Sequence, residues 1–244
     1  MDTHKIPIIT IDGPSASGKG TIAQLVAKKL GFHYLDSGAL YRLVALKTMR
    51  SHADTHNTDQ LAEIARNLNV VFVNEDIYLD GTIVTDDIRA EQCGILASQI
   101  AAHPQVREAL TERQRTFCQP PGLVTDGRDM GSVIFPNAVL KIFLTASAEV
   151  RAQRRYKQLI EKGMSDNIAD LLQDIQKRDE RDSNRSIAPL RQGADAQLLD
   201  TTSLTISQAQ DAVLSWYNEI CAKNPSLDMK QPHFSLASDL QKEK

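Results

Sequence analysis

The sequence predicts an α/β fold, in which a parallel sheet is flanked by helices and a smaller subdomain is inserted into the chain. An apolar strand at residues 6–11 leads directly into a glycine-rich segment and then a helix. Apolar segments at residues 123–126 and 139–144 are typical of buried parallel strands. The short β-type runs over residues 70–85 indicate an antiparallel meander, which a parallel core does not contain, so they predict the insertion.

Residues 13–21 read GPSASGKGT and have the context of a phosphate-binding loop. Glycines let the backbone curl so that its N–H groups face one concavity, and the following helix adds positive charge at its N-terminus. Lys19 adds a full charge for the outer phosphates. Gly20 stands where such loops usually carry a Ser or Thr that contacts Mg²⁺. The alternative, a chance glycine-rich turn, is less consistent with the preceding buried strand.

The residues predicted to bind the phosphates of a nucleotide are those of the loop itself: Gly13, Pro14, Ser15, Ala16, Ser17, Gly18, Lys19, Gly20 and Thr21.

Three helices are expected in the next part of the chain. The first covers residues 19–30 with Ile22 and Val26 on its apolar face, and it ends at Gly31. The second begins after Asp36 or Ser37, either of which can cap it. The third is short and covers residues 59–68.

The meander over residues 70–85 contains Asp80-Gly81, a strong signal for a two-residue hairpin. Helices at residues 88–102 and 104–117 follow, the second with Pro104 in its first turn.

The second half of the chain returns to the core. After the two apolar strands we expect helices at residues 148–162 and 167–181, a strand near 197–199 and a helix at 207–222. The tail that follows is polar and lacks periodicity, which predicts a loose segment.

Composition places the chain among ordinary globular proteins. Its 244 residues are 41% hydrophobic and 24% charged, and the net charge of −3 argues against broad nucleic-acid binding. Three scattered cysteines without a CxxC pair favour neither a disulfide framework nor a zinc site. The sequence shows no signal-peptide pattern and no 18-residue apolar span, so we expect a cytoplasmic protein that does not bind a membrane.

One predicted helix carries charge on its inward face. Its apolar stripe has the spacing of a helix packed on a core and consists of Ile168, Leu171, Leu172 and Ile175. The same stripe continues to Arg178 and Asp182. Charged groups on a buried face need partners, so this pattern favours a functional site over a solvated helix end.

The preceding helix places Arg151, Arg154 and Arg155 on one face. Such a face is often only solvated. It also suits a lid that brings positive charge over a phosphoryl group in transfer and excludes water.

Asp126, Arg128 and Asp129 follow a predicted core strand. A carboxylate at the end of a strand beside a phosphate-binding loop is suited to hold Mg²⁺ or its waters. Because Gly20 cannot coordinate a metal, Asp126 is the predicted metal residue, with the hydroxyl of Thr21 as a minor contributor.

Four segments together resemble the bacterial cytidylate kinases of the nucleoside monophosphate kinase family: residues 13–21, 35–42 (LDSGALYR), 126–131 (DGRDMG) and 178–185 (RDERDSNR). The resemblance covers about residues 6–222. It implies a P-loop NTPase-type core made of residues 1–36 and 118–222, with a short lid at about 148–166. It also implies a nucleoside monophosphate (NMP)-binding region at 37–117, with the antiparallel insert at about 70–85, and leaves residues 223–244 as the loose tail.

The resemblance implies transfer of the γ-phosphoryl group of ATP to CMP or dCMP, with Mg²⁺ as cofactor. Catalytic residues would be Lys19, Asp126, Arg128, Arg154 and Arg155. Residues that hold the acceptor sugar and phosphate would be Ser37, Arg42, Arg128, Arg178, Asp182 and Arg185. The cytosine would be read by Ser98, Arg107 and Asp129.

The chemistry of cytosine suits this assignment. Its 4-amino group donates to a carboxylate, and its O2 and N3 atoms accept from Arg and Ser. Uracil would present a carbonyl oxygen to Asp129 and leave a polar group unpaired, so we expect discrimination between the two bases.

Other functions fit less well. The chain lacks the Asn/Thr-Lys-x-Asp motif of GTPases and the Leu-Ser-Gly-Gly signature of ABC ATPases. A kinase for UMP or AMP, and a nucleotide-dependent switch, stay as alternatives. His52 and His56 have metal-ligand spacing without a third ligand, so we interpret them as surface residues. We expect a monomer.

Overall fold

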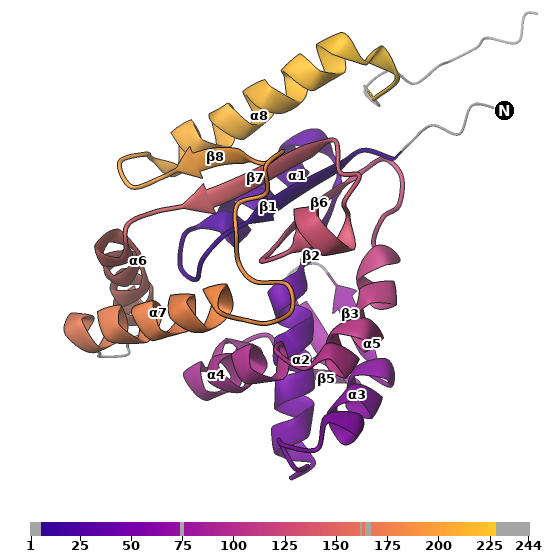
Figure 1. Cartoon of the computed structure of the whole chain (residues 1–244), viewed down its shortest axis with the longest axis vertical. Helices are drawn as coiled ribbons and strands as arrows, with labels where there is room; N and C mark the ends of the chain where they lie inside the picture. Colours follow the sequence, from indigo (N-terminus) through magenta and orange to yellow (C-terminus); the bar gives the residue numbers. More distant parts are fainter. Residues whose placement is uncertain (1–5, 74–75, 162, 164–166, 228–244) are drawn as a thin grey trace, which may run out of the picture.

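The computed structural model describes residues 6–73, 76–161, 163 and 167–227. Its centre is a five-stranded parallel sheet in the order β2-β6-β1-β7-β8 (Figure 1). The strands are β1 (Ile8–Asp12), β2 (His33–Asp36), β6 (Leu123–Gly127), β7 (Leu140–Thr145) and β8 (Gln197–Asp200). The strand order reverses at β1, so the loop after β1 lies where parallel α/β sheets bind ligands.

Helices cover both faces of the sheet. On one face, α1 (Lys19–Leu30) and α8 (Ile206–Lys223) pack in a buried cluster with the sheet residues Ile9, Ile11 and Ile142. Figure 1 shows α8 on one side of the sheet and the helices of the inserted region on the other. The predicted parallel core is confirmed.

The inserted region consists of helices around a small antiparallel sheet. Its elements are α2 (Ser37–Arg50), α3 (Thr58–Arg66), β3 (Val70–Val73), β4 (Asp76–Leu79), β5 (Thr82–Ile83), the 3₁₀ turn Asp87–Arg89, α4 (Glu91–Ile100) and α5 (Pro104–Arg115). The hairpin between β4 and β5 has positive φ at Asp80 (51°) and Gly81 (81°), as a type I′ turn requires. The predicted meander is confirmed. The predicted helix at 88–102 begins later, because Ala90 is extended with ψ 144°.

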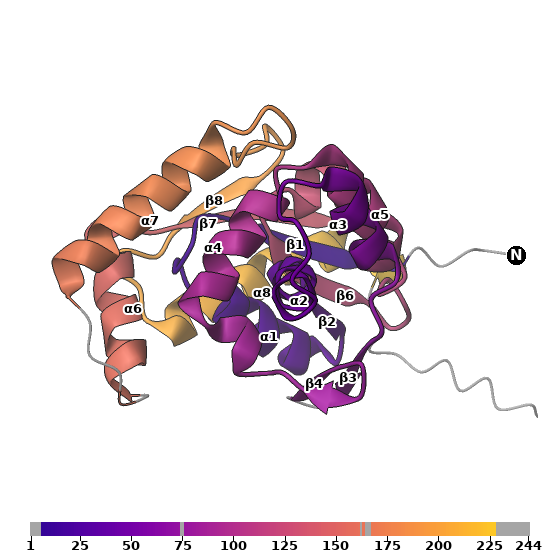
Figure 2. The ribbon, with the colours of Figure 1, turned by 90° about the horizontal axis from the view of Figure 1, so that it is seen from below.

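One buried apolar cluster continues from the sheet into the inserted region. It joins Leu35 and Leu123 of the sheet to Leu40, Leu61 and Leu110 of the helices. Figure 2, viewed from below, shows these helices gathered against the sheet. The two predicted regions therefore share a core, and their division into domains stays a prediction.

The predicted lid contains α6 (Ala148–Glu161), which packs against α7 (Ile168–Ser183). Residues 162 and 164–166 of that prediction lie outside the described residues. In the apolar stripe of α7, Leu171 and Ile175 are buried, whereas Ile168 is 43% exposed and does not belong to the core.

The tail differs from the prediction at its start. Residues Pro225–Leu227 form a 3₁₀ turn against α8, in which Leu227 is buried and its carbonyl accepts a hydrogen bond from the Tyr217 hydroxyl at 3.2 Å. Residues 228–244, to which the prediction of a loose tail also applied, lie outside the described residues.

Strand β2 is an element that sequence patterns did not predict. It has four residues, His33–Asp36, and pairs in parallel with β6, with Asp36 opposite Asp126. Tyr34 and Asp36 point to one face of the sheet because side chains alternate along a strand. Four residues with two polar positions are too few to show that alternation in the sequence.

Gly13 is required by a close approach of two strands. A Cβ atom there would lie 2.0 Å from the Leu144 carbonyl oxygen, a backbone atom that cannot move without shifting β7. We expect Gly13→Ala to lower the free energy of unfolding by about 2 kcal/mol. Gly20→Ala is the matched control, because its Cβ would have no neighbour nearer than 3.6 Å. Urea unfolding checks both variants, and equal stability of the two would contradict the prediction.

Candidate active site

The phosphate-binding loop lies between β1 and α1, as predicted. Two of its residues, Ala16 (φ 56°) and Gly18 (φ 94°), have left-handed backbone, which curls the loop before α1 begins at Lys19. The Lys19 ammonium donates a hydrogen bond to the Pro14 carbonyl at 3.2 Å. The Ser17 hydroxyl is buried and has no hydrogen-bond partner among the described residues.

Two arginines of α6 donate hydrogen bonds to backbone carbonyls of the loop. Arg151 donates to the Ser15 carbonyl at 3.2 Å and pairs with Asp179 at 2.6 Å. Arg154 donates to the Ser17 carbonyl at 3.0 Å and to the Thr201 carbonyl at 2.6 Å. These contacts support the loop's backbone, and the predicted approach of Arg154 to a phosphoryl group stays a prediction.

Arg155 does not contact the loop among the hydrogen bonds and ion pairs of the described residues. It lies on α6 but pairs with Glu91 of α4 at 3.2 Å, so it joins the predicted lid to the inserted region. The three arginines that share one predicted helix face thus contact different parts of the molecule.

Asp126 lies at the end of β6, beside the loop. Burial raises the pKa of Asp126, and the nearby charge of Asp36 adds to the effect, while Lys19 opposes it. Burial also lowers the pKa of the Lys19 ammonium, and the charge of Arg128 lowers it further. Tyr34 donates a hydrogen bond to Oδ1 of Asp126 at 2.7 Å.

These residues fit a magnesium ion of the kind that ATP carries. Mg²⁺ is usually bound by one or two carboxylates together with substrate phosphates and water, rather than by a cage of side chains. Asp126 supplies a buried carboxylate next to the loop. Among the described residues, no group of three or more His, Cys, Asp or Glu side chains is suited to a metal, so the phosphates would have to complete the coordination.

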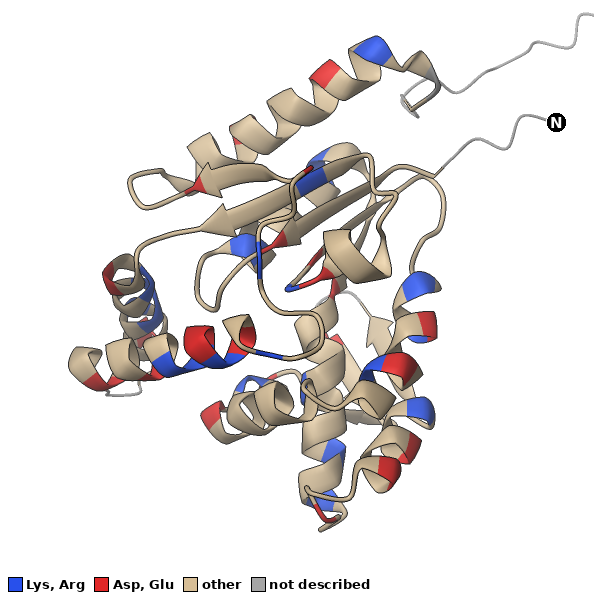
Figure 3. Cartoon of the chain, viewed as in Figure 1, with Lys and Arg blue, Asp and Glu red and all other residues tan. Residues whose placement is uncertain are grey.

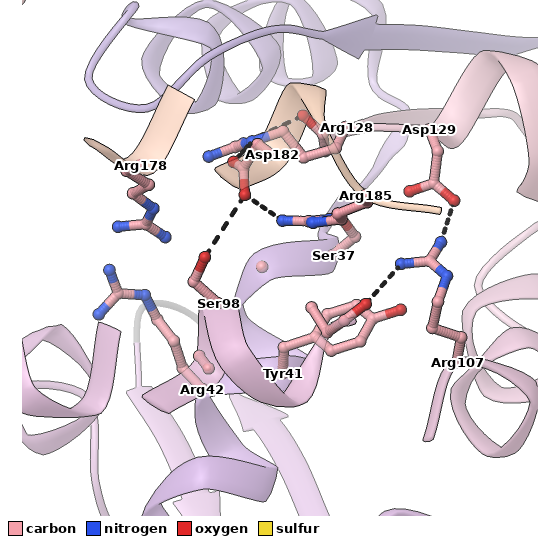
Figure 4. A pocket seen from close by; sticks show the side chains of 14 residues that line it. Ser37, Tyr41, Arg42, Ser98, Arg107, Arg128, Asp129, Arg178, Asp182 and Arg185 are labelled. Atoms are coloured by element: carbon pink, nitrogen blue, oxygen red, sulfur yellow. Dashed lines mark hydrogen bonds and ion pairs between the residues drawn. The ribbon is translucent and has the colours of Figure 1, made fainter. Parts of the chain in front are cut away.

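A cavity opens between the sheet edge, α2, α4, α5 and α7. All nine residues predicted to bind the acceptor nucleotide line it: Ser37, Arg42, Ser98, Arg107, Arg128, Asp129, Arg178, Asp182 and Arg185. Figure 4 shows them converging from separate elements. The fold therefore brings together predicted residues that lie up to 148 positions apart in the sequence, from 37 to 185.

The cavity has an excess of positive charge. Five arginines and two aspartates line it. In Figure 3, blue and red segments lie side by side along α7, and further blue and red segments lie near the strand ends at the centre of the molecule. An excess of buried positive charge is suited to a phosphate.

Asp182 is the hub of this cluster. Its side chain is 1% exposed and pairs with Arg128 through Oδ2 at 2.7 Å and with Arg185 through Oδ1. Ser98 donates to the same carboxylate at 3.4 Å. In this structure Ser98 therefore contacts Asp182, and its predicted role in reading cytosine stays a prediction.

Arg107 and Asp129 form a buried ion pair at the other end of the cavity. Burial raises the pKa of Asp129, and the charge of Arg107 opposes that effect. The Arg107 guanidinium lies 5.9 Å from the centre of the Tyr41 ring. Tyr41 lines the cavity too, a position that sequence reasoning did not assign although it adjoins Arg42 in the LDSGALYR segment.

Arg178 and Arg42 face each other across the cavity (Figure 4). Burial lowers the pKa of Arg178 to about 10, and the nearby charge of Arg128 contributes. The Nε atoms of Arg178 and Arg185 are buried without a hydrogen-bond partner among the described residues. Buried donors of this kind are satisfied when an anion binds.

Asp12 connects the phosphate-binding loop to the cavity. It ends β1, and its carboxylate accepts hydrogen bonds from the backbone N–H groups of Met130 and Gly131, both at 2.8 Å. These residues begin the turn Met130–Ile134 that follows Asp129. These two hydrogen bonds therefore fix the position of the segment that carries Arg128 and Asp129 relative to the loop. No sequence pattern predicts this contact.

The chain was compared with known proteins. A family model described as cytidylate kinase matches residues 9–219. A cytidylate kinase from Nitrosomonas europaea is 59% identical over 219 residues, which are 90% of this chain and 98% of the relative. A cytidylate kinase from Burkholderia thailandensis is 58% identical over 217 residues, which are 89% of this chain and 95% of the relative. None of the described helices is long and apolar enough to cross a membrane.

Replacement of Asp182 tests the charge cluster. Burial alone would raise the pKa of Asp182, but the charges of Arg128 and Arg185 outweigh it and hold the pKa below 3.8. The ionised group therefore stabilises the fold above pH 3.8, and that contribution is lost as the pH falls through the lowered pKa. We expect Asp182→Asn to cost about 3 kcal/mol at pH 7.

Urea unfolding between pH 3 and pH 7 measures the effect, and the difference from the unmodified protein should narrow at the acidic end. Asp174→Asn is the matched control, because Asp174 is an exposed carboxylate on the same helix. A loss of stability for Asp182→Asn no larger than that of the control would contradict the role of Asp182 as a hub.

Proposed function

The chain belongs to the cytidylate kinase family, and we propose that it transfers the γ-phosphoryl group of ATP to CMP and dCMP. One observation supports this most directly. The phosphate-binding loop and the arginine-lined cavity meet at the same edge of the sheet, so that Lys19 experiences the charges of Arg128 and Arg178. A donor phosphate on the loop and an acceptor phosphate in the cavity would be neighbours, as transfer requires.

The cavity offers separate groups for the two ends of a nucleoside monophosphate. Asp129 and Arg107 present a carboxylate acceptor and guanidinium donors side by side, which complements the amino group and the O2 and N3 atoms of cytosine. Asp182 and Arg178 line the part of the cavity away from Arg107 and Asp129, and they suit the ribose and its phosphate. Tyr41 adds an aromatic wall beside the base-reading pair.

Charge neutralisation is the main task of the remaining residues. The acceptor phosphate is already an anionic nucleophile, so no side chain needs to remove a proton from it. Arg128, Arg178 and Arg185 would offset the charge of the acceptor phosphate, and Lys19 would offset that of the donor. Phosphoryl transfer proceeds through positioning and electrostatic stabilisation of this kind.

Mg²⁺ is proposed as the cofactor. It would neutralise charge on the ATP phosphates. Asp126 would hold the ion or its waters, with Thr21 as a lesser contributor. Arg154 would keep the loop's backbone in shape, and Arg155 would join the lid to the inserted region through Glu91. The monomeric state and the cytoplasmic location stay predictions from the sequence.

Base choice is expected to depend on Asp129. In Asp129→Asn the side chain can donate to the O4 atom of uracil, so the preference for CMP over UMP should fall about tenfold or more. An ADP-release assay with CMP, dCMP, UMP and AMP measures kcat/KM for each acceptor. Asp174→Asn, on the exposed side of α7, should keep the native preference. Native preference for UMP or AMP would contradict the base assignment.

Turnover is expected to depend on Lys19 and on the metal. We expect Lys19→Met to lower kcat about 100-fold or more, because a charge that stabilises the transferring group is lost. Chelation of Mg²⁺ with EDTA should abolish turnover of the unmodified protein. Calorimetry should show CMP binding within a few-fold of native in Lys19→Met. ATP hydrolysis that is indifferent to every monophosphate would contradict a kinase function.

A further inference from the structure

Position 20 of the phosphate-binding loop lacks the hydroxyl that this kind of loop usually supplies. In the general pattern a Ser or Thr follows the lysine, and its hydroxyl contacts Mg²⁺. Here Gly20 follows Lys19. The space in front of Gly20 is not filled by backbone, because an added Cβ would meet only ordinary van der Waals neighbours.

The atoms in front of Gly20 are those of a hydroxyl and a carboxylate. The added Cβ would lie 3.6 Å from the Tyr34 hydroxyl oxygen, and 3.8 and 3.9 Å from the two carboxylate oxygens of Asp126. A hydroxyl on a side chain at position 20 would thus project toward the place that the Tyr34 hydroxyl occupies. That hydroxyl comes from β2, the strand next to β6.

Tyr34 is well placed to act on Asp126. Its hydroxyl donates to Oδ1 of the carboxylate at 2.7 Å, and β2 and β6 pair in parallel so that Tyr34 and Asp126 stay close. A phenol is protonated at neutral pH, so the Tyr34 hydroxyl is a hydrogen-bond donor to this carboxylate. The side chain of Gln24 and the carboxylate of Asp36 are its other polar neighbours.

We propose that Tyr34 is a positioning residue for Mg²⁺–ATP, whose hydroxyl orients the Asp126 carboxylate in place of the hydroxyl missing at Gly20. The inference rests on the proposed function only in that ATP and Mg²⁺ bind at the loop. Partners that orient a ligating carboxylate commonly change metal affinity or activity by about 10- to 100-fold when they are removed.

The test compares ATP binding with and without the metal, in the absence of any acceptor. Calorimetry on the full chain gives the dissociation constant for ATP in Mg²⁺ and in EDTA. In Tyr34→Phe, which keeps the ring and removes only the hydroxyl, the constant should rise about tenfold in Mg²⁺ and stay within twofold in EDTA.

A second pair of variants tests the exchange of hydroxyls. Gly20→Ser combined with Tyr34→Phe supplies a hydroxyl from the loop and should recover most of the affinity in Mg²⁺. Gly20→Ala combined with Tyr34→Phe fills the same space without a hydroxyl and should not. Tyr78→Phe removes a hydroxyl in β4, away from the loop, and should match the unmodified protein.

Three results would overturn the proposal. Equal weakening of ATP binding in Mg²⁺ and in EDTA would show a structural role for Tyr34. No change in either condition would show that its hydroxyl is dispensable. Equal recovery by Ser and Ala at position 20 would show that volume matters and the hydroxyl does not. Because no acceptor is present, failure of the protein to phosphorylate CMP leaves this test unaffected.

Discussion

Repulsion among clustered arginines is the constraint on which the rest of the site depends. Five of them line one cavity, and only two aspartates oppose them there. Asp182 makes the arrangement stable, because its buried carboxylate pairs with Arg128 and Arg185. The uncompensated charge that remains is suited to an acceptor phosphate. The same charged cluster thus contributes to stability and to phosphate binding. The residues that line the cavity come from the sheet edge and from α2, α4, α5 and α7.

Backbone contacts tie the donor side to this cluster. The Asp12 carboxylate binds the N–H groups of Met130 and Gly131, so the strand before the phosphate-binding loop also sets the segment that carries Arg128 and Asp129. Arg154 fixes the loop from the other side through the Ser17 carbonyl. Phosphoryl transfer needs two phosphates held in line, and a loop braced from both sides meets that need. The apolar core shared by the sheet and the inserted region also holds these two parts in place relative to each other.

Prediction succeeded where a local pattern has a single physical cause. Asp80-Gly81 favours a type I′ hairpin, and the structure has one with positive φ at both residues. The stripe on α7 led to Asp182, which is 1% exposed. Sequence patterns did not predict the contacts between distant segments. Ser98 donates a hydrogen bond to Asp182, and Arg154 donates to the Ser17 carbonyl. The roles predicted for Ser98 in reading cytosine and for Arg154 in catalysis stay predictions. A helix face shows which way a side chain points, but not which atom meets it.

The sequence by itself determined the phosphate-binding loop and the order of all the main elements except β2, and its resemblance to a family indicated the residues that gather in the cavity. The loop and the elements follow from local conformation and periodicity, whereas the cavity residues followed from the resemblance to the cytidylate kinases. Only the tertiary structure decided how the residues pair. Strand β2 is too short to be recognised in the sequence, and the Tyr34–Asp126 contact depends on its parallel pairing with β6. The reason is physical. Hydrogen bonds and ion pairs depend on distances of a few ångströms between atoms that lie 92 positions apart in the chain, and packing alone fixes those distances.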